Sequence, residues 1–360
     1  MQVLAFEDDL WARMVERLGG AERLELSARE HGALVRKRGV DSAQTLLRSV
    51  LAYGPGGLSL RQVEAQAAAR GIAEISDVAW MNRFRGCEAW LMALVEELLA
   101  KGAAPTPRGE EGPVVRLVDA SRIEGPGETA LRLHLCWDAS RRRICDLALT
   151  GLDQGERLDR LAFQPGEIRI GDAGLTHPGG LQKAQAAKAE VLVRVSWKSL
   201  RLLDAQGQPL DWLALCQASH EAGGLDMPVT VTKPRGRFEP LSMRLVIRPK
   251  PPQTLHEANR RIRRSAAKGQ RKIDPRTLAC AEHMILLTSL SQEAFPPEQL
   301  YELYRFRWQI ELAFKRLKSI LRIDRLPAKS NTLARAWIAA HLLFALLLED
   351  TAADLAGVFP

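Results

Sequence analysis

The sequence predicts an α/β domain with an all-helical domain in front of it. Residues 1–100 are rich in helix-like patterns, whereas strand-like runs begin at residue 114. Between these regions, residues 102–113 are dense in Gly and Pro, which is the composition of a linker. We therefore expect a helical N-terminal domain at residues 1–108 and an α/β domain at residues 109–360.

The order of elements after the linker is three strands, a helix, a strand, a helix and a strand, which is the order of an RNase H-like domain. The regular pattern stops at residues 196–281, and we interpret this segment as a mainly β insertion. A strand at 284–288 follows, and two prolines then lead into a long helix at 298–321. The elements before the insertion are expected at residues 114–118, 131–137, 143–150, 156–162, 167–170, 179–188 and 190–195.

Two helices of the N-terminal domain are joined by a short turn that contains Gly71. Ser59 and Ser76 are their candidate caps, and the second helix is expected at 77–99. Such a pair fits a helix-turn-helix, a motif that binds DNA. We favour a plain helical hairpin, because such pairs are common and this region is not basic. In a helix-turn-helix, the second helix would present Trp80, Asn82, Arg83 and Arg85.

The positive charge of the chain is concentrated in one segment. The 360 residues carry a formal net charge of +8, yet residues 1–100 hold 12 Lys and Arg against 14 acidic residues. Residues 233–276 hold 14 Lys and Arg against three acidic residues. Such a stripe is typical of a surface that binds a phosphate backbone, although a solvated loop explains it equally well by composition alone. Its densest part contains Arg260, Arg261, Arg263 and Arg264.

Cysteines and apolar runs bear on where the protein resides. The five cysteines include no pair with zinc-ligand spacing, so we expect reduced core residues of a cytoplasmic protein. Residues 1–10 contain three acidic residues, and we do not expect a signal peptide there. The longest apolar run, residues 337–348, is too short to span a bilayer. We expect it to form a buried helix, and we expect no membrane partner.

Three carboxylates stand out by their settings. Asp119 and Asp172 each end an apolar strand, where rigid backbone would hold them beside a cleft, and Glu311 lies within the long helix. At about 100° per residue, Glu311 falls in a narrow polar strip opposite the apolar face. A solvated helix face with ion pairs is the simpler interpretation, but the two aromatic residues in and beside the strip and the two upstream aspartates argue against it. The strip contains Tyr304, Arg307, Glu311, Lys318 and Arg322, flanked by Trp308 and Lys315.

Three such carboxylates suit a site that cleaves phosphodiesters with two metal ions. The reaction needs a nucleophile at neutral pH and neutralisation of the charge on the leaving oxygen, and two Mg²⁺ ions roughly 4 Å apart provide both. Mg²⁺ takes hard oxygen ligands and keeps several waters, so a few carboxylates suffice. Arg and Lys side chains near the metals would hold the phosphates.

The helix residues also match a known signature. The intervals between Tyr304, Arg307, Glu311 and Lys318 are those of the Tyr-Arg-Glu-Lys motif in one branch of the bacterial insertion-sequence DDE transposases (insertion sequence family four type). The helix motif is the specific part of this resemblance, which covers roughly residues 20–350. Other segments that resemble the family are VDASRIEGPG at 118–127, IGDAGL at 170–175 and LTSL at 287–290.

The resemblance implies a DNA transposase that cuts at terminal inverted repeats and inserts the excised element into target DNA. Asp119, Asp172 and Glu311 would bind Mg²⁺, for which Mn²⁺ can substitute. The resemblance further implies a homodimer in the DNA complex and association with the nucleoid. Some members stack a flipped base on an aromatic residue, for which Trp197 and Trp212 are candidates. The implied contacts to DNA at the element's end are Tyr304, Arg307, Lys315 and Lys318.

Three alternatives remain open from the sequence. A nuclease of the same fold would cut without strand transfer, although the basic insertion and the full motif spacing argue against it. A catalytically impaired, shortened copy would bind DNA and inhibit active copies. The early end at Pro360 favours this second alternative, because relatives often continue into a segment that pairs protomers, whereas the intact carboxylates argue against it. A structural protein with incidental acids is the least favoured.

Overall fold

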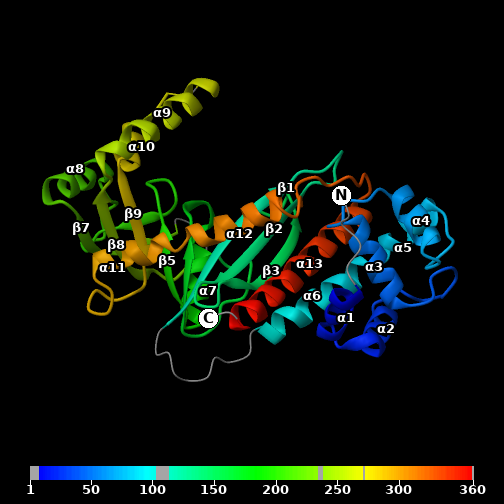
Figure 1. The fold of residues 1–360 in the computed structure, drawn as a ribbon. Helices are drawn as coiled ribbons and strands as arrows, with labels where there is room; N and C mark the ends of the chain where they lie inside the picture. The colour runs from blue at the N-terminus through cyan, green and yellow to red at the C-terminus, as the bar shows by residue number, and fades with distance from the viewer. Residues whose placement is uncertain (1–7, 103–112, 234–237, 271, 359–360) are drawn as a thin grey trace.

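The computed structural model describes residues 8–102, 113–233, 238–270 and 272–358, and its centre is one long mixed sheet (Figure 1). The nine strands of this sheet have the order β3-β2-β1-β4-β5-β9-β8-β7-β6. Strand β4 is parallel to both of its neighbours, β1 and β5, and the other pairs are antiparallel. The strands are β1 (Val114–Ile123), β2 (Leu131–Asp138), β3 (Arg143–Gly151), β4 (Glu167–Gly171), β5 (Glu190–Arg194), β6 (Arg201–Leu203), β7 (Leu225–Thr232), β8 (Leu241–Pro249) and β9 (His283–Thr288).

The first five strands have the order that the sequence predicts. The predicted bounds of β2, β3, β4 and β5 each lie within one residue of the observed bounds. Helix α7 (Pro178–Ala186) connects β4 to β5, where a helix at 179–188 was expected. The fold is therefore a mixed α/β fold consistent with an RNase H-like domain.

The segment expected as an insertion extends this sheet and does not form a sheet of its own. Strand β9 pairs with β5 on one side and with β8 on the other, so β8, β7 and β6 continue the same sheet. The expectation of mainly β structure was wrong, because the helices of this segment contain more residues than its strands. One of them, α9, projects from the outer end of the sheet (Figure 1). These helices are α8 (Trp212–Ala222), α9 (Pro252–Lys268) and α10 (Pro275–Ala281).

The last helix, α13 (Asn331–Val358), packs against three of the six N-terminal helices, α3, α5 and α6, beside strands β1 to β3 (Figure 1). A single hydrophobic cluster joins residues of these helices to residues of the sheet. The run predicted as a buried helix lies in α13, whose apolar part is long enough to cross a membrane by length and composition but is 72% buried inside the fold. The division at residue 108 stays a prediction, since α13 packs with helices from the other side of it. The six helices are α1 (Asp8–Arg17), α2 (Gly20–Glu30), α3 (Ala43–Tyr53), α4 (Leu60–Ala69), α5 (Asp77–Arg85) and α6 (Glu88–Gly102).

Caps define the helices around the predicted hairpin. The side chain of Ser59 accepts the backbone N–H of Gln62, and the side chain of Gln62 accepts the backbone N–H of Ser59, which starts α4 with a capping box. The side chain of Ser76 accepts the backbone N–H of Ala79 at the start of α5. The helix predicted at 77–99 is interrupted at Gly86, so α5 and α6 are separate helices.

Two of the residues that a helix-turn-helix would present on α5 are engaged within the chain. The side chain of Trp80 is fully buried. Arg83 donates hydrogen bonds to the backbone carbonyls of Arg36 and Arg38 at 2.8 and 2.7 Å. This arrangement favours the interpretation of the two helices as a plain helical hairpin over a helix-turn-helix.

The long helix predicted at 298–321 is two helices, α11 (Pro297–Arg305) and α12 (Trp308–Ser319). Helix α11 contacts β5, whereas α12 packs on β1 and β2. Phe306 and Arg307 separate the two helices, so that each helix packs on its own part of the twisted sheet. Phe306, at the junction of the two helices, is 45% exposed. The apolar side of α12 is buried through Ile310, Phe314 and Leu317.

Candidate active site

Asp119 lies within β1, which continues beyond it, so the expectation that Asp119 ends the strand was wrong. Its carboxylate accepts the backbone N–H of Ala120 at 2.8 Å. Burial raises the pKa of Asp119 to about 6. The hydrogen bond from Ala120 and the charge of Arg307 oppose this rise, whereas the charges of Glu156 and Asp172 add to it. Asp119 is therefore a partly buried carboxylate, and charged residues of three other segments affect its pKa.

Asp172 directly follows β4 and precedes the short helix η1 (Ala173–Leu175). Strands β1 and β4 are parallel neighbours, with Leu117 opposite Ile170. Continuing this register by two residues brings Asp172 level with Asp119. The two aspartates thus occupy matching positions on adjacent strands, in agreement with the electrostatic influence of Asp172 on Asp119.

Groups from two other elements contact the carboxylate of Asp172. The hydroxyl of Tyr304, on α11, donates to Oδ1 of Asp172 at 3.2 Å. Nη1 of Arg194, the last residue of β5, lies 4.0 Å from the same oxygen. Burial and the charge of Asp172 raise the pKa of Tyr304, so its hydroxyl remains a donor at neutral pH. The motif analysis missed Arg194, although its place at the end of the strand beside β4 was a usable signal.

Arg307 and Glu311 meet at the start of α12. Nη2 of Arg307 lies 2.6 Å from Oε1 of Glu311, and the guanidinium carbon lies 5.8 Å from the ring centre of Tyr304. Burial acts to lower the pKa of Arg307, but Tyr304, Glu311 and Asp172 together raise it above its ordinary value. One guanidinium therefore interacts with Asp119, Asp172 and Glu311, which the structure brings to the same region.

The donor chemistry of this region fits Mg²⁺. The three carboxylates offer hard oxygen ligands, which Mg²⁺ prefers, from two adjacent strands and one helix turn. Among the residues that the structure describes, no three Asp, Glu, His or Cys side chains lie close enough together to enclose a metal ion as they stand. Glu311 is instead paired with Arg307. The three carboxylates therefore fit Mg²⁺ by the type of their ligand atoms and by their location in the fold.

The remaining predicted DNA contacts lie on separate elements. On α12, the side chain of Lys315 is exposed and that of Lys318 is partly exposed. Helix α9 lies apart from α12 (Figure 1), so its arginines are on a separate element from Glu311. The side chain of Arg261 lies outside the described residues. The exposed arginines of α9 are Arg260, Arg263 and Arg264.

The two tryptophans considered for base stacking differ in accessibility. Nε1 of Trp197 donates to the hydroxyl of Thr277 at 3.1 Å, and the guanidinium of Arg276 lies 3.8 Å from the ring centre. Nζ of Lys198 lies 4.7 Å from the same ring centre, so two cations contact Trp197. Trp212 is only 6% exposed and belongs to a hydrophobic cluster that joins the insertion to β1, α7 and β5, so it serves as a core residue.

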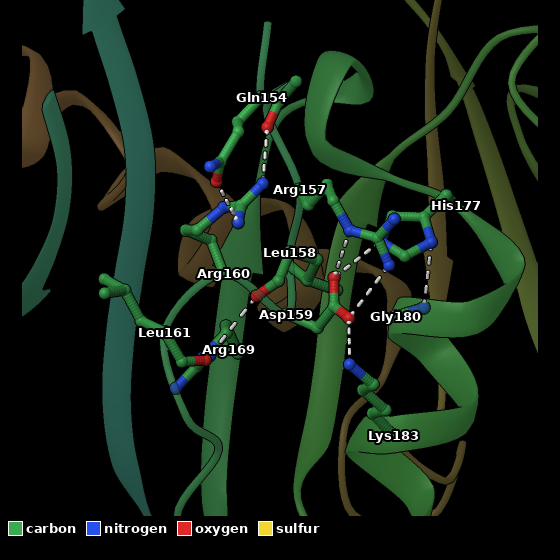
Figure 2. A network of polar contacts seen from close by, with 11 residues as sticks. Gln154, Arg157, Leu158, Asp159, Arg160, Leu161, Arg169, His177, Gly180 and Lys183 are labelled. Atoms are coloured by element: carbon green, nitrogen blue, oxygen red, sulfur yellow. Dashed lines mark hydrogen bonds and ion pairs between the residues drawn. The ribbon is translucent and has the colours of Figure 1, made fainter. Parts of the chain in front are cut away.

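The connection between β3 and β4 is a loop, and the helix predicted at 156–162 was wrong. A buried arginine of β4, Arg169, inserts beneath this loop (Figure 2). Because its guanidinium gathers several loop carbonyls at one point, these carbonyls cannot align along a helix axis. The charged pair in an otherwise apolar strand, Glu167 and Arg169, was a signal of this arrangement. The carbonyls that accept from Arg169 are those of Leu158 (3.3 Å), Leu161 (2.7 Å) and Ala162 (2.7 Å).

A second network ties the same loop to the segment after Asp172 (Figure 2). The carboxylate of Asp159, with a side chain only 3% exposed, lies 2.8 Å from both Nε2 of His177 and Nζ of Lys183. It also accepts from Nε of Arg157 at 3.0 Å. Although burial opposes them, these partners hold the pKa of Asp159 well below its usual range. The loop and the turn that carries Asp172 are therefore held together as one unit.

Comparison with known proteins finds similarity over most of the chain. Residues 110–348 match the family described as the transposase DDE domain. The chain is 38% identical over 350 residues to the putative transposase InsL for insertion sequence element IS186A of Escherichia coli (strain K12), a match that covers 96% of this chain and 94% of the relative. It is also 38% identical over 351 residues to the transposase for insertion sequence element IS421 of Escherichia coli, with the same coverage.

These findings define the class of this protein, which is an enzyme of the DDE transposase type. Its substrate is DNA, and its family generally uses divalent metal. The chain belongs to the DDE transposase family.

Proposed function

We propose that this transposase cuts DNA at terminal inverted repeats and joins the 3′ ends to target DNA by two-metal phosphoryl transfer, with Asp119, Asp172 and Glu311 as metal ligands. The observation that supports this proposal is the matching position of Asp119 and Asp172 on adjacent strands, with Arg307, the ion-pair partner of Glu311, close enough for its charge to act on both. A two-metal site needs its ligands around a shared centre. Two adjacent strands and one helix supply them here, all within the matched domain.

The chain's own residues are suited to hold Mg²⁺, or Mn²⁺ in its place, at these oxygens. When bound, the ions would activate the attacking hydroxyl and neutralise charge on the leaving oxygen. The hydroxyl of Tyr304 orients the carboxylate of Asp172, and the backbone N–H of Ala120 orients that of Asp119. With a pKa of about 6, Asp119 is ionised at neutral pH, as a metal ligand must be.

Cations beside the carboxylates are placed to hold the phosphates at the element's end. They lie on or next to α12, the helix that carries Glu311. Arginine can grip a phosphate with two parallel hydrogen bonds, whereas lysine acts as a point charge. Their spacing supports assignment to the Tyr-Arg-Glu-Lys branch of family four type. The proposed contacts are the cations Arg307, Lys315 and Lys318, together with the neutral side chain of Tyr304.

Helix α9 offers a second basic surface away from the carboxylates. Exposed arginines on a projecting helix suit contacts to the DNA backbone, which position the duplex without reading its sequence. Trp197 remains our candidate for stacking on a flipped base, in which case Arg276 would leave the ring face that it covers. The proposed α9 contacts are Arg260, Arg261, Arg263 and Arg264.

We infer that the active form is a homodimer on DNA, because one event must hold two element ends together. Both relatives are named as transposases of insertion sequence elements in Escherichia coli. A bacterial element transposes within its host chromosome, so we place the protein in the cytoplasm, associated with the nucleoid.

A strand-transfer assay tests this function. Labelled duplexes carrying the inverted repeats that flank the gene are incubated with the protein, Mg²⁺ and a plasmid target. A transposase yields cleaved ends and joined products, a nuclease of the same fold yields cleaved ends alone, and an inhibitor binds the ends without cutting them. Either of the last two results would overturn the proposal. Glu302→Gln, an exposed position on α11 outside the site, serves as the matched control for loss of an acid.

A further inference from the structure

Arg307 occupies a position between elements that both carry site residues. It lies in the break between α11 and α12 and precedes the first turn of α12, which holds Glu311. Its side chain is 21% exposed, and its Nε has no hydrogen-bond partner among the described residues. A buried guanidinium N–H without a partner costs free energy, so the arginine is incompletely satisfied in the free chain.

The ion-pair partner of Arg307 within the described part of the chain, Glu311, is a proposed metal ligand. Its Nη2 lies 2.6 Å from Oε1 of Glu311, and the side chain of Glu311 is 54% exposed. Ion pairs four residues apart on an exposed helix face are weak. A guanidinium can exchange such a pair for a phosphate, which matches its fork geometry and can satisfy a second N–H. The ion pair is therefore close enough to hold Glu311 in the free chain. It is also weak enough for a DNA phosphate to take the place of Glu311 as the partner of Arg307.

Metal ions and Arg307 compete for the same negative charge. Arg307 interacts electrostatically with Asp119 and Asp172 as well as with Glu311. A divalent ion that bound all three carboxylates would have to displace the guanidinium from Glu311. The charge of a nearby fixed cation would also weaken metal binding by repulsion. Movement of Arg307 onto a DNA phosphate would remove both obstacles at once.

We propose that Arg307 is a positioning residue that couples DNA binding to metal binding: in the free chain it holds Glu311 in an ion pair, and on the DNA end it moves to a phosphate and releases Glu311 to the metal. This inference rests on the proposed function of the three carboxylates. Coupling of this kind is reciprocal, so DNA raises metal affinity and metal raises DNA affinity by the same factor. The metal site is completed only when a DNA end of the element is bound. This coupling limits cleavage of other DNA.

The test measures Mn²⁺ binding by electron paramagnetic resonance, with and without a duplex carrying the element's end, and does not depend on turnover. For the wild type, the duplex should raise Mn²⁺ affinity by about tenfold, within the usual range of coupling between sites. Arg307→Met should raise the affinity of the free protein by a similar factor and should abolish the effect of the duplex. Arg305→Met removes an exposed arginine two positions earlier and should leave both affinities near those of the wild type.

The result that overturns the inference is an Arg307→Met protein whose Mn²⁺ affinity without DNA is unchanged or lower, or one in which the duplex still raises affinity as in the wild type. Equal effects of Arg305→Met and Arg307→Met would also overturn it, since general charge would then explain both. If Asp119→Asn and Glu311→Gln leave Mn²⁺ binding intact, it is the proposed metal site that fails, which separates the two claims.

A second variant keeps the test decisive if Arg307→Met does not fold. Glu311→Gln frees Arg307 without removing it, so DNA-end affinity measured in EDTA should rise several-fold. Glu302→Gln, which removes an exposed acid from α11, controls for the change in net charge. Equal gains for the two glutamine variants would contradict release of Arg307, and a larger gain for Glu311→Gln supports it.

Discussion

The buried ion pair between Arg169 and Glu167 offers a quantitative test of how the site is supported. The side chains are 0% and 1% exposed, and Nη2 of Arg169 lies 2.6 Å from Oε1 of Glu167. Arg169→Met removes this partner together with the donors to three loop carbonyls. Arg116 remains near Glu167 at 3.2 Å. Removing one member of a buried pair costs about 3–5 kcal/mol, and we expect a loss of that order in the free energy of unfolding.

Urea unfolding of the variant measures this loss, and pH provides a sharper check. Burial raises the pKa of Glu167, and its arginine neighbours oppose the rise. Without Arg169 the pKa of Glu167 should rise further, so its ionised form is penalised at neutral pH and the penalty fades as falling pH protonates it. The Arg169→Met defect should therefore be smaller at pH 5 than at pH 7.5. The double variant Glu167→Gln with Arg169→Met should recover part of the loss. A defect under about 1 kcal/mol, or one independent of pH, would refute the reasoning.

Two further predictions concern Asp119 and α9. Because burial raises the pKa of Asp119 to about 6, above its unfolded value, ionised Asp119 lowers stability at pH 7.5 and has no such effect below about pH 4. Asp119→Asn should therefore raise the urea midpoint at pH 7.5 and leave it unchanged at pH 4, whereas equal shifts at both pH values would contradict the shift in pKa. On α9, neutralising four arginines should flatten the dependence of log DNA affinity on log salt by up to about four units, with little change in discrimination between cognate and random ends. An unchanged slope would remove α9 from the DNA interface. The four are Arg260, Arg261, Arg263 and Arg264.

The central strands were predictable because apolar and β-branched residues define them. Strand β1 was expected to stop at residue 118, since its apolar run ends there. The observed strand continues through Asp119 to Ile123, because those residues pair with β2 through backbone groups whatever their side chains are. Local pattern thus locates a buried strand but not its polar extension.

Two predicted helices failed for reasons that lie outside their own sequence. The segment 156–162 is a loop because Arg169, on a later strand, gathers its carbonyls. The helix at 298–321 is broken because its halves pack on different strands of the sheet. The spacing of Tyr304 and Glu311 was informative despite this break, although the two lie on different helices and contact Asp172 and Arg307 respectively. Arg194 belongs to no motif, and its role follows from the strand order, which places the end of β5 beside Asp172.

The central claim is that Asp119, Asp172 and Glu311 form one metal site for DNA cleavage, and single-turnover cleavage of a cognate end in Mg²⁺ tests it most directly. The wild type is compared with Asp119→Ala, Asp172→Ala and Glu311→Ala, after circular dichroism and DNA-binding measurements establish that each variant folds and binds. Each variant removes a partly exposed or exposed carboxylate and not a core side chain. The account predicts that each one abolishes cleavage. Cleavage by any one of them at a rate near that of the wild type would contradict it and remove that residue from the site.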